Sequence, residues 1–145
     1  MGAAAAYAGM RVSEGSLQLI ERIFDQFNRT GQPPTDSMHP DVEWKPLRED
    51  PDFEVRRGRE AVHAYLAGWG EAFDQLQAEI VERVPAGDKI FVWVRLTGKG
   101  RGSETPIVME EGIVYTFRDG RIASGAEFTD RAEARRAAGL EGDDG

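Results

Sequence analysis

Two glutamates in the last third of the chain, Glu111 and Glu127, are the residues best suited to chemistry. They lie in the stretch 104–130, where two runs rich in β-branched and aromatic residues flank a tight turn. On one pocket wall, two carboxylates cannot both ionise without a large free-energy cost, so one pKa rises. The protonated partner can then act as an acid and the other as a base. Alternatively, one or both glutamate side chains face solvent or pair with Arg95 or Arg121 across strands, because carboxylates on strands are usually charged surface groups.

The turn between the two runs decides which face each glutamate takes. In a two-residue turn at Asp119–Gly120, Glu111 lies opposite Phe128 and Glu127 points to the other face. In a three-residue turn over 118–120, with the glycine left-handed in a bulge, Glu111 lies opposite Glu127 on one face. Because side chains alternate along a strand, a slip of one residue exchanges the two faces. Both turns suit this sequence.

Aromatic residues elsewhere in the chain are candidates to line a hydrophobic pocket for a flat, ring-bearing ligand. They are Phe24, Trp44, Tyr65, Trp69, Trp93 and Tyr115. The alternative is ordinary core or a dimer interface, and core is the interpretation we favour for Phe24 and Tyr65. His39 and His63 are isolated from carboxylates at ligand spacing, so we predict no metal site and no cofactor.

The composition limits the class of protein. The chain has 145 residues, a net charge of −8 without a basic stripe, and no cysteine. This charge argues against nucleic acid or an anionic membrane as a partner. No apolar run approaches the roughly 20 residues that span a bilayer. The Ala-rich start has its first charge after the apolar run, unlike a signal peptide, so we expect a cytoplasmic protein.

The hydrophobic pattern predicts three helices and five strands in one domain. We expect helices over 13–28, 58–73 and 131–138, and strands over 42–44, 77–84, 89–97 and the two runs of the final hairpin. Consecutive hairpins form an antiparallel sheet, and the helices must cover one face of it, which is α+β architecture. Residues 1–12 are expected to be a disordered lead and residues 140–145 an acidic tail.

Four segments resemble the SnoaL-like (polyketide cyclase-like) branch of the nuclear transport factor 2-like superfamily. They are HPDVEW (39–44), RRGREAVHAYL (56–66), AGDKIFVWVRLTGKGRGS (86–103) and YTFRDGRI (115–122). The resemblance covers residues 13–139 as a single domain. It implies a cystatin-like fold, in which N-terminal helices wrap a curved, mostly antiparallel sheet into a cone with a pocket in its mouth and a short C-terminal helix follows. It also implies a homodimer.

The resemblance to ketosteroid isomerases does not extend to their functional groups. Those enzymes hold an enolate oxygen with a tyrosine and a protonated aspartic acid and move the proton with a second aspartate. In this chain the tyrosine position holds Phe24 and the position of the protonated aspartic acid holds Ile113. The position of the second aspartate falls near Pro46. The resemblance therefore does not imply steroid isomerisation by that machinery.

The resemblance to SnoaL-like cyclases points to Glu127. In those enzymes an aspartate late in the last strand is the general acid/base, and the spacing from the GRI segment places Glu127 there. The resemblance also puts Gly125 and Thr129 on the pocket side, which favours the three-residue turn. The histidine that accompanies the cyclase aspartate is not matched, because Gly125 and Ala126 occupy its neighbourhood.

Two functions follow as hypotheses. The first is a cofactor-free isomerase, cyclase or hydrolase for a small hydrophobic or polyketide-like molecule, with Glu127 as acid/base and Glu111 tuning it. The predicted ligand-binding residues are Phe24, Trp44, Tyr65, Trp69, Ile113, Tyr115 and Thr129. The second is a non-catalytic ligand-binding or scaffold domain of the same fold.

Overall fold

The computed structural model describes residues 2–140, and the side chains of residues 14–140. In chain order the elements are α1 (Gly2–Thr30), η1 (Thr35–Ser37), β1 (Met38–Lys45), β2 (Arg56–Arg57), α2 (Arg59–Ala72), β3 (Phe73–Ala86), β4 (Lys89–Gly100), β5 (Pro106–Arg118), β6 (Arg121–Phe128) and α3 (Arg131–Ala137). The six strands form one sheet in the order β2-β1-β6-β5-β4-β3. All neighbours are antiparallel except β1 and β6. The predicted α+β fold is confirmed.

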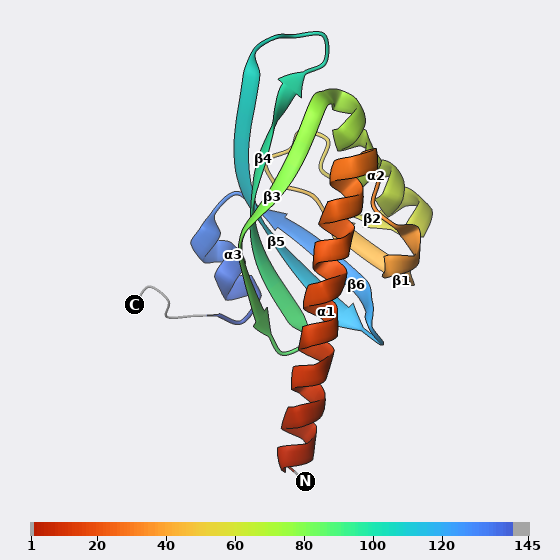
Figure 1. The fold of residues 1–145 in the computed structure, drawn as a ribbon, viewed down its shortest axis with the longest axis vertical. Helices are drawn as coiled ribbons and strands as arrows, with labels where there is room; N and C mark the ends of the chain where they lie inside the picture. Colours follow the sequence, from red (N-terminus) through yellow and green to blue (C-terminus); the bar gives the residue numbers. More distant parts are fainter. Residues whose placement is uncertain (1, 141–145) are drawn as a thin grey trace.

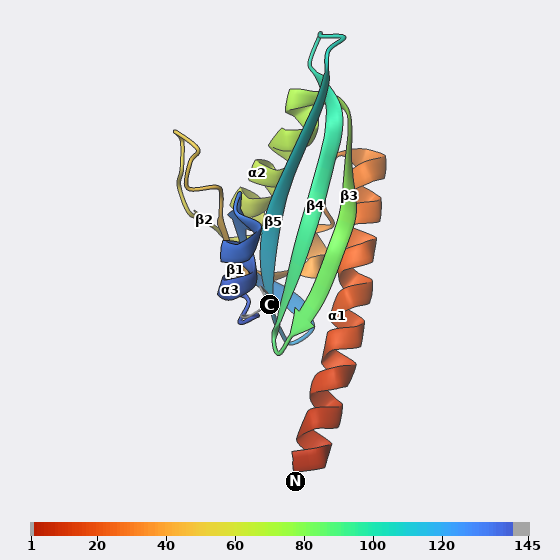
Figure 2. The same ribbon diagram turned by 90° about the vertical axis from the view of Figure 1, so that its left-hand side faces the viewer.

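The helices cover both faces of the sheet, not one face alone as the sequence predicted. Figures 1 and 2 show α1 on one side of the sheet and the short α3 on the other. The main core lies between the sheet and helices α1 and α2, where the apolar stripe of α1 packs against inward-facing strand residues. A second, smaller core under α3 contains Phe91, Trp93 and Val114.

The first helix begins earlier in the chain than predicted. Helix α1 begins at Gly2, so the backbone of residues 2–12, predicted to be disordered, is helical. The predicted acidic tail lies outside the described residues apart from Leu140, which packs against the smaller core.

The final hairpin, β5–β6, takes neither predicted register. Arg118 pairs with Arg121, so the turn is Asp119–Gly120, with φ values of 55° and 76° at its two residues. These positive values are those of a two-residue hairpin turn, and the predicted three-residue turn is wrong. A bulge at Ala123 supplies the extra residue instead, because Thr116 pairs with Ser124 and the next pair is Phe117 with Ile122.

The bulge in β6 sets which side chains face the main core. Ile122 and Glu127 are five residues apart, and strict alternation would place them on opposite faces. With one residue bulged out, both face inward, and Glu127 lies opposite Ile113. Glu111 and Glu127 therefore share a face, as the resemblance implied, although they are not directly opposite each other.

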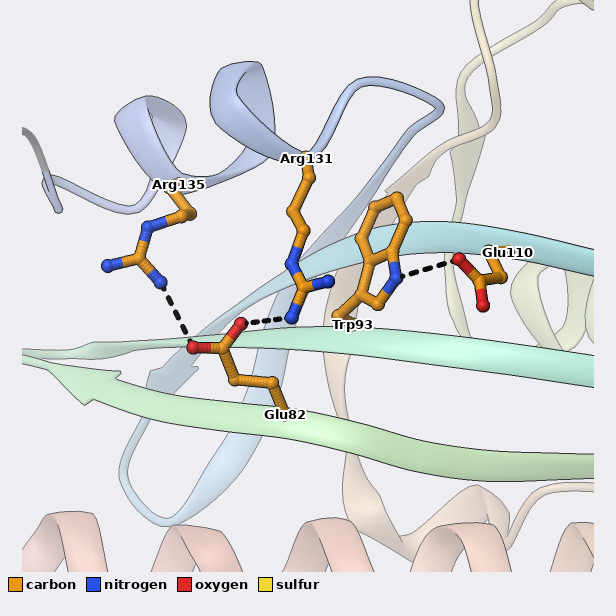
Figure 3. A network of polar contacts seen from close by, with 5 residues as sticks. All are labelled: Glu82, Trp93, Glu110, Arg131 and Arg135. Atoms are coloured by element: carbon orange, nitrogen blue, oxygen red, sulfur yellow. Dashed lines mark hydrogen bonds and ion pairs between the residues drawn. The ribbon is translucent and has the colours of Figure 1, made fainter. Parts of the chain in front are cut away.

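Helix α3 is fastened to the outer face of the sheet by charged side chains. Glu82 on β3 pairs with Arg131 at 2.6 Å and with Arg135 at 3.2 Å. The Arg131 guanidinium also lies 5.1 Å from the centre of the Trp93 ring, whose indole N–H donates to Glu110 at 3.3 Å (Figure 3). This charged face of α3 is therefore a packed contact and is not left to solvent.

Replacing Glu82 with Gln is expected to lower the free energy of unfolding by about 0.5–2 kcal/mol, since it weakens two partly exposed ion pairs. Chemical denaturation at low salt measures this change. Glu79→Gln is the control, because Glu79 is more exposed and pairs with Arg95 at 3.7 Å. Equal losses in the two variants would show that the Glu82 pairs do not fasten α3.

Candidate functional site

A cavity lies between the inner face of the sheet and helices α1 and α2, with a volume of about 80 Å³. Its walls are largely apolar, and the residues that line it are Ile23, Phe24, Phe27, Pro33, Ser37, Met38, Val42, Trp44, Leu66, Trp69, Ala78, Val94, Leu96, Glu111, Ile113, Tyr115, Ile122 and Glu127. Two carboxyl groups in such walls are unusual, because a buried charge is costly unless it is paired or hydrogen-bonded.

Glu127 is held by hydrogen bonds from two sides. Its side chain is only 5% exposed. The indole N–H of Trp44 donates to Oε2 at 2.7 Å, and the hydroxyl of Tyr65 lies 3.1 Å from both carboxylate oxygens. These donors come from β1 and α2, so strand and helix together fix the orientation of the carboxylate. Donors of this kind favour its charged form.

Gly125 makes the contact between Trp44 and Glu127 possible. Strands β1 and β6 run parallel, with Trp44 next to Gly125 in the register. A Cβ atom at position 125 would lie 2.2 Å from Cζ3 of Trp44. Glycine therefore lets the indole lie against β6 and reach the carboxylate two residues further along the strand.

Replacing Gly125 with Ala is expected to lower the free energy of unfolding by about 1–3 kcal/mol, because the new methyl group overpacks against the indole. Displacement of Trp44 should also change the tryptophan fluorescence. Gly68→Ala is the control, since a Cβ there meets nothing within 4 Å and lies within α2. Alanine is the better helix former, so this control should be neutral or stabilising. A Gly125→Ala protein as stable as wild type would contradict this account of the site.

Glu111 is the second carboxyl group of the cavity and has fewer partners. It is 8% exposed, and its Oε1 is buried without a hydrogen-bond partner. Burial raises the pKa of Glu111 well above its usual value, and the charge of Glu127 and a hydrogen bond to it raise that pKa further.

The pKa of Glu127 is also raised, chiefly by burial. Hydrogen bonds from Trp44, Tyr65, Glu111 and the backbone of Leu47 oppose that rise. We therefore assign the proton to Glu111 and the negative charge to Glu127, because only Glu127 has several donors to stabilise the charge. Two neighbouring carboxyls with different protonation states can serve as an acid and a base.

The two tyrosines near the acid pair differ in position. Tyr115 lies in the cavity wall, and its ring meets that of Trp44 edge to face at 5.8 Å. Tyr65 lies beside the cavity, with Arg56 5.3 Å from its ring centre. Burial, followed by the nearby carboxylates, raises the pKa of both phenols, so both remain neutral hydrogen-bonding groups.

The structure brings most of the predicted site residues together. Glu111, Glu127, Phe24, Trp44, Trp69, Ile113 and Tyr115 all line the cavity. Tyr65 does not line it and instead contacts Glu127. The placement of Thr129 on the pocket side is wrong, because β6 ends at Phe128 and Thr129 is exposed, with its hydroxyl 3.5 Å from Glu49.

Sequence reasoning did not assign several cavity residues to the site. Phe27 follows Phe24 by three residues, the spacing of one helix face, and this spacing was the available signal. Met38 and Val42 lie on β1, which is longer than the predicted strand. The chain gives no local signal for Ser37, a buried polar residue in η1.

Within residues 2–140, no helix combines the length and apolarity needed to cross a bilayer. The described part of the chain also holds no group of three or more His, Cys, Asp or Glu side chains arranged to bind a metal ion.

Comparison with known proteins identifies the family. The model of the SnoaL-like domain matches residues 20–125. The chain belongs to the SnoaL-like domain family. The predicted membership is thereby confirmed. No curated protein sequence matches the chain.

Solved structures of similar proteins share the fold. A protein from Jannaschia sp. CCS1, described as a SnoaL-like polyketide cyclase, is 18% identical with a TM-score of 0.66, over 90% of this chain and 96% of that one. TerC, co-crystallised with polyporic acid, is 17% identical with a TM-score of 0.67, over 86% and 98%. A protein from Catenulispora acidiphila with a ketosteroid isomerase-like fold, in complex with trimethylamine, is 17% identical with a TM-score of 0.58, over 73% and 79%.

Proposed function

We propose that this SnoaL-like protein is a cofactor-free enzyme that moves a proton on a small hydrophobic or polyketide-like molecule, as an isomerase, cyclase or hydrolase. Glu127 is the general base and protonated Glu111 its partner acid. The observation that carries the proposal is the buried acid pair, in which one carboxyl has two side-chain donors and the other an unpartnered oxygen.

The proposed step transfers one proton in each direction. The Glu127 carboxylate removes a proton from a carbon next to a carbonyl group, and the Glu111 acid gives its proton to the carbonyl oxygen. The pair gains one proton and loses one, so its charge is unchanged and the product is an enol. In an isomerisation, Glu127 returns its proton to a different carbon and Glu111 takes back the enol O–H proton. In a ring closure, the enol carbon attacks a second carbonyl, whose oxygen takes the proton held by Glu127, while Glu111 takes back the enol O–H proton.

Four aromatic residues support the base and position the substrate. Trp44 and Tyr65 hold the carboxylate of Glu127, which fixes the direction from which it takes the proton. Tyr115 and Trp69 supply the apolar walls that exclude water and position the substrate. The cavity volume of about 80 Å³ is below the roughly 300–1,000 Å³ of drug-sized sites. The substrate is therefore small, or the walls move apart as it enters.

The test is exchange of substrate hydrogen for deuterium. The protein is incubated in heavy water with small cyclic ketones, aromatic polyketides and terpene epoxides, and NMR records deuterium at carbons next to carbonyls and any ring opening. Protein-dependent exchange in at least one carbonyl compound, absent with Glu127→Gln, is the expected result. Exchange that persists in Glu127→Gln would remove Glu127 from the mechanism.

The second candidate is a non-catalytic ligand-binding or scaffold domain. The occupied oxygens of Glu127 favour it, since hydrogen bonds that stabilise a carboxylate also weaken it as a base. The similar structures with polyporic acid and trimethylamine support small-molecule binding in either case. Binding of a carbonyl compound without any exchange would select this candidate.

We also propose a cytoplasmic homodimer with no nucleic-acid or membrane partner. A dimer would cover apolar residues on the outer face of the sheet that α3 leaves exposed. Helix α3 covers Val114, and Phe128 packs beside it. Ile122 faces the inner core. Val81 and Val108 remain exposed. Analytical ultracentrifugation tests the dimer, and a monomer at high concentration would exclude it.

A further inference from the structure

We propose that the cavity selects a small organic cation, an alkylammonium group, in preference to a neutral molecule of the same shape. This inference goes beyond the proposed function, because it concerns the charge of the ligand and does not require turnover. It rests on the acid pair, on the absence of a counter-charge, and on the aromatic walls.

The acid pair has no positive partner in the described structure. None of the eighteen described residues that line the cavity is a lysine, arginine or histidine. The carboxylate of Glu127 is held by neutral donors, the Trp44 indole and the Tyr65 hydroxyl. A buried anion held by neutral donors alone remains attractive to a cation, and the low dielectric of the cavity strengthens that attraction.

Glu111, which also shares a hydrogen bond with Glu127, provides a second observation. Its side chain is more than nine-tenths buried and lines the cavity, and its Oε1 has no hydrogen-bond partner. A buried polar atom without a partner is rare in a folded protein and requires an explanation. An alkylammonium N–H is a donor that would satisfy such an oxygen, and its charge would also offset that of Glu127.

The remaining walls suit the alkyl part of such a cation. Five aromatic rings line the cavity: Phe24, Phe27, Trp44, Trp69 and Tyr115. The faces of aromatic rings attract cations, and cages of such rings bind quaternary and tertiary ammonium groups. The cavity volume of about 80 Å³ suits a ligand of a few heavy atoms. Trimethylammonium is therefore a suitable probe.

Titration calorimetry with two ligands of similar shape tests the charge preference. Trimethylamine hydrochloride carries a positive charge at pH 7.5, and tert-butyl alcohol is a neutral analogue of similar size. The expected result is an affinity for trimethylammonium at least tenfold higher than for tert-butyl alcohol. Equal affinities, or no binding of the cation, would overturn the inference.

Charge-removing variants locate the effect. Glu127→Gln should lower the affinity for trimethylammonium at least tenfold and leave that for tert-butyl alcohol within about twofold. Glu110→Gln is the matched control, because Glu110 precedes Glu111 on β5 but contacts Trp93 and Arg95 on the outer face. It should bind both ligands as wild type does. Circular dichroism verifies that each variant is folded, and unchanged cation affinity in folded Glu127→Gln would overturn the inference.

The pH dependence gives an additional readout. Tetramethylammonium has no titrating proton, so any change in its affinity reports the protein. The titratable groups around the acid pair are Glu111, Glu127, Tyr65 and Tyr115, and the tyrosines stay neutral. The charged side chain packed against this group is Arg56, which lies 5.3 Å from the ring centre of Tyr65 and does not line the cavity. Acidification protonates the pair, so the affinity should fall. Affinity that is constant down to pH 4 would overturn the inference.

The two proposals can fail separately. If Glu127→Gln loses deuterium exchange but the wild-type protein binds charged and neutral ligands equally, the cation preference is rejected and the proposed function is retained.

Discussion

Replacing Glu127 with Gln is expected to lower the rate of proton transfer about 10²–10⁴-fold, the usual contribution of a positioned general base. Glutamine keeps the shape of the side chain and an oxygen that can accept from Trp44, but it cannot take up a proton. The effect should appear in kcat for any carbonyl substrate found by deuterium exchange. KM should change little, because the apolar walls that bind the substrate remain.

The same variant should be at least as stable as wild type. Burial raises the pKa of Glu127, so its charge is carried at a free-energy cost that a neutral amide avoids. Activity and stability are then expected to move in opposite directions, as is common at functional sites. Glu110→Gln again serves as the control, with unchanged kcat. A Glu127→Gln protein that retains full activity would exclude Glu127 as the base.

The second large effect is on the pH dependence of stability. The pKa of Glu111 is raised well above 4.5 in the folded protein. Between 4.5 and the folded value, the folded state keeps a proton that the unfolded state has lost. The stabilisation is therefore fully present below pH 4.5, falls as pH rises through this window, and levels off above the folded pKa. The slope is at most about 1.4 kcal/mol per pH unit for one proton.

The difference between wild type and Glu111→Gln isolates this effect from the many surface carboxylates. Urea denaturation from pH 4 to pH 8 should give a free energy of unfolding for wild type that declines relative to the variant as pH rises. The pKa of the neighbouring Glu127 is also raised, so its contribution to the pH dependence of stability has the same sign. The Glu110→Gln variant provides the baseline for removing an acid from the same strand. A difference that stays flat or increases with pH would contradict the assignment of the proton to Glu111.

The local pattern of residue types along the chain was sufficient to predict most of the fold. The stripe of Ile20, Ile23 and Phe24 defined the inward face of α1, and β-branched runs defined β4 and β5. These signals depend on period and residue type, which a sequence displays directly. The N-terminal cap of α3 also depends on residues close together in the sequence, since the Asp130 side chain accepts a hydrogen bond from the backbone N–H of Glu133.

The details of the site depend on contacts between distant segments. The bulge at Ala123 is what lets Ile122 and Glu127 face one cavity, and the turn residues alone do not specify it. The role of Gly125 requires Trp44 on the neighbouring parallel strand, far away in sequence. The contacts of Arg131 and Arg135 with Glu82 likewise appear only once α3 lies on the sheet. The residue types of the acid pair were predictable, but its surroundings were not.

The central claim is that Glu111 and Glu127 share one proton inside an apolar cavity at neutral pH. Carbon-13 NMR of protein labelled at the glutamate side-chain carboxyl carbons measures this directly, with Glu111→Gln and Glu127→Gln used to assign the two signals. We expect the Glu111 carbon to have the shift of a protonated acid at pH 7 and to titrate well above 4.5, with a linked change at Glu127. Two carboxyl signals that both titrate near 4.5, independently of each other, would contradict the account.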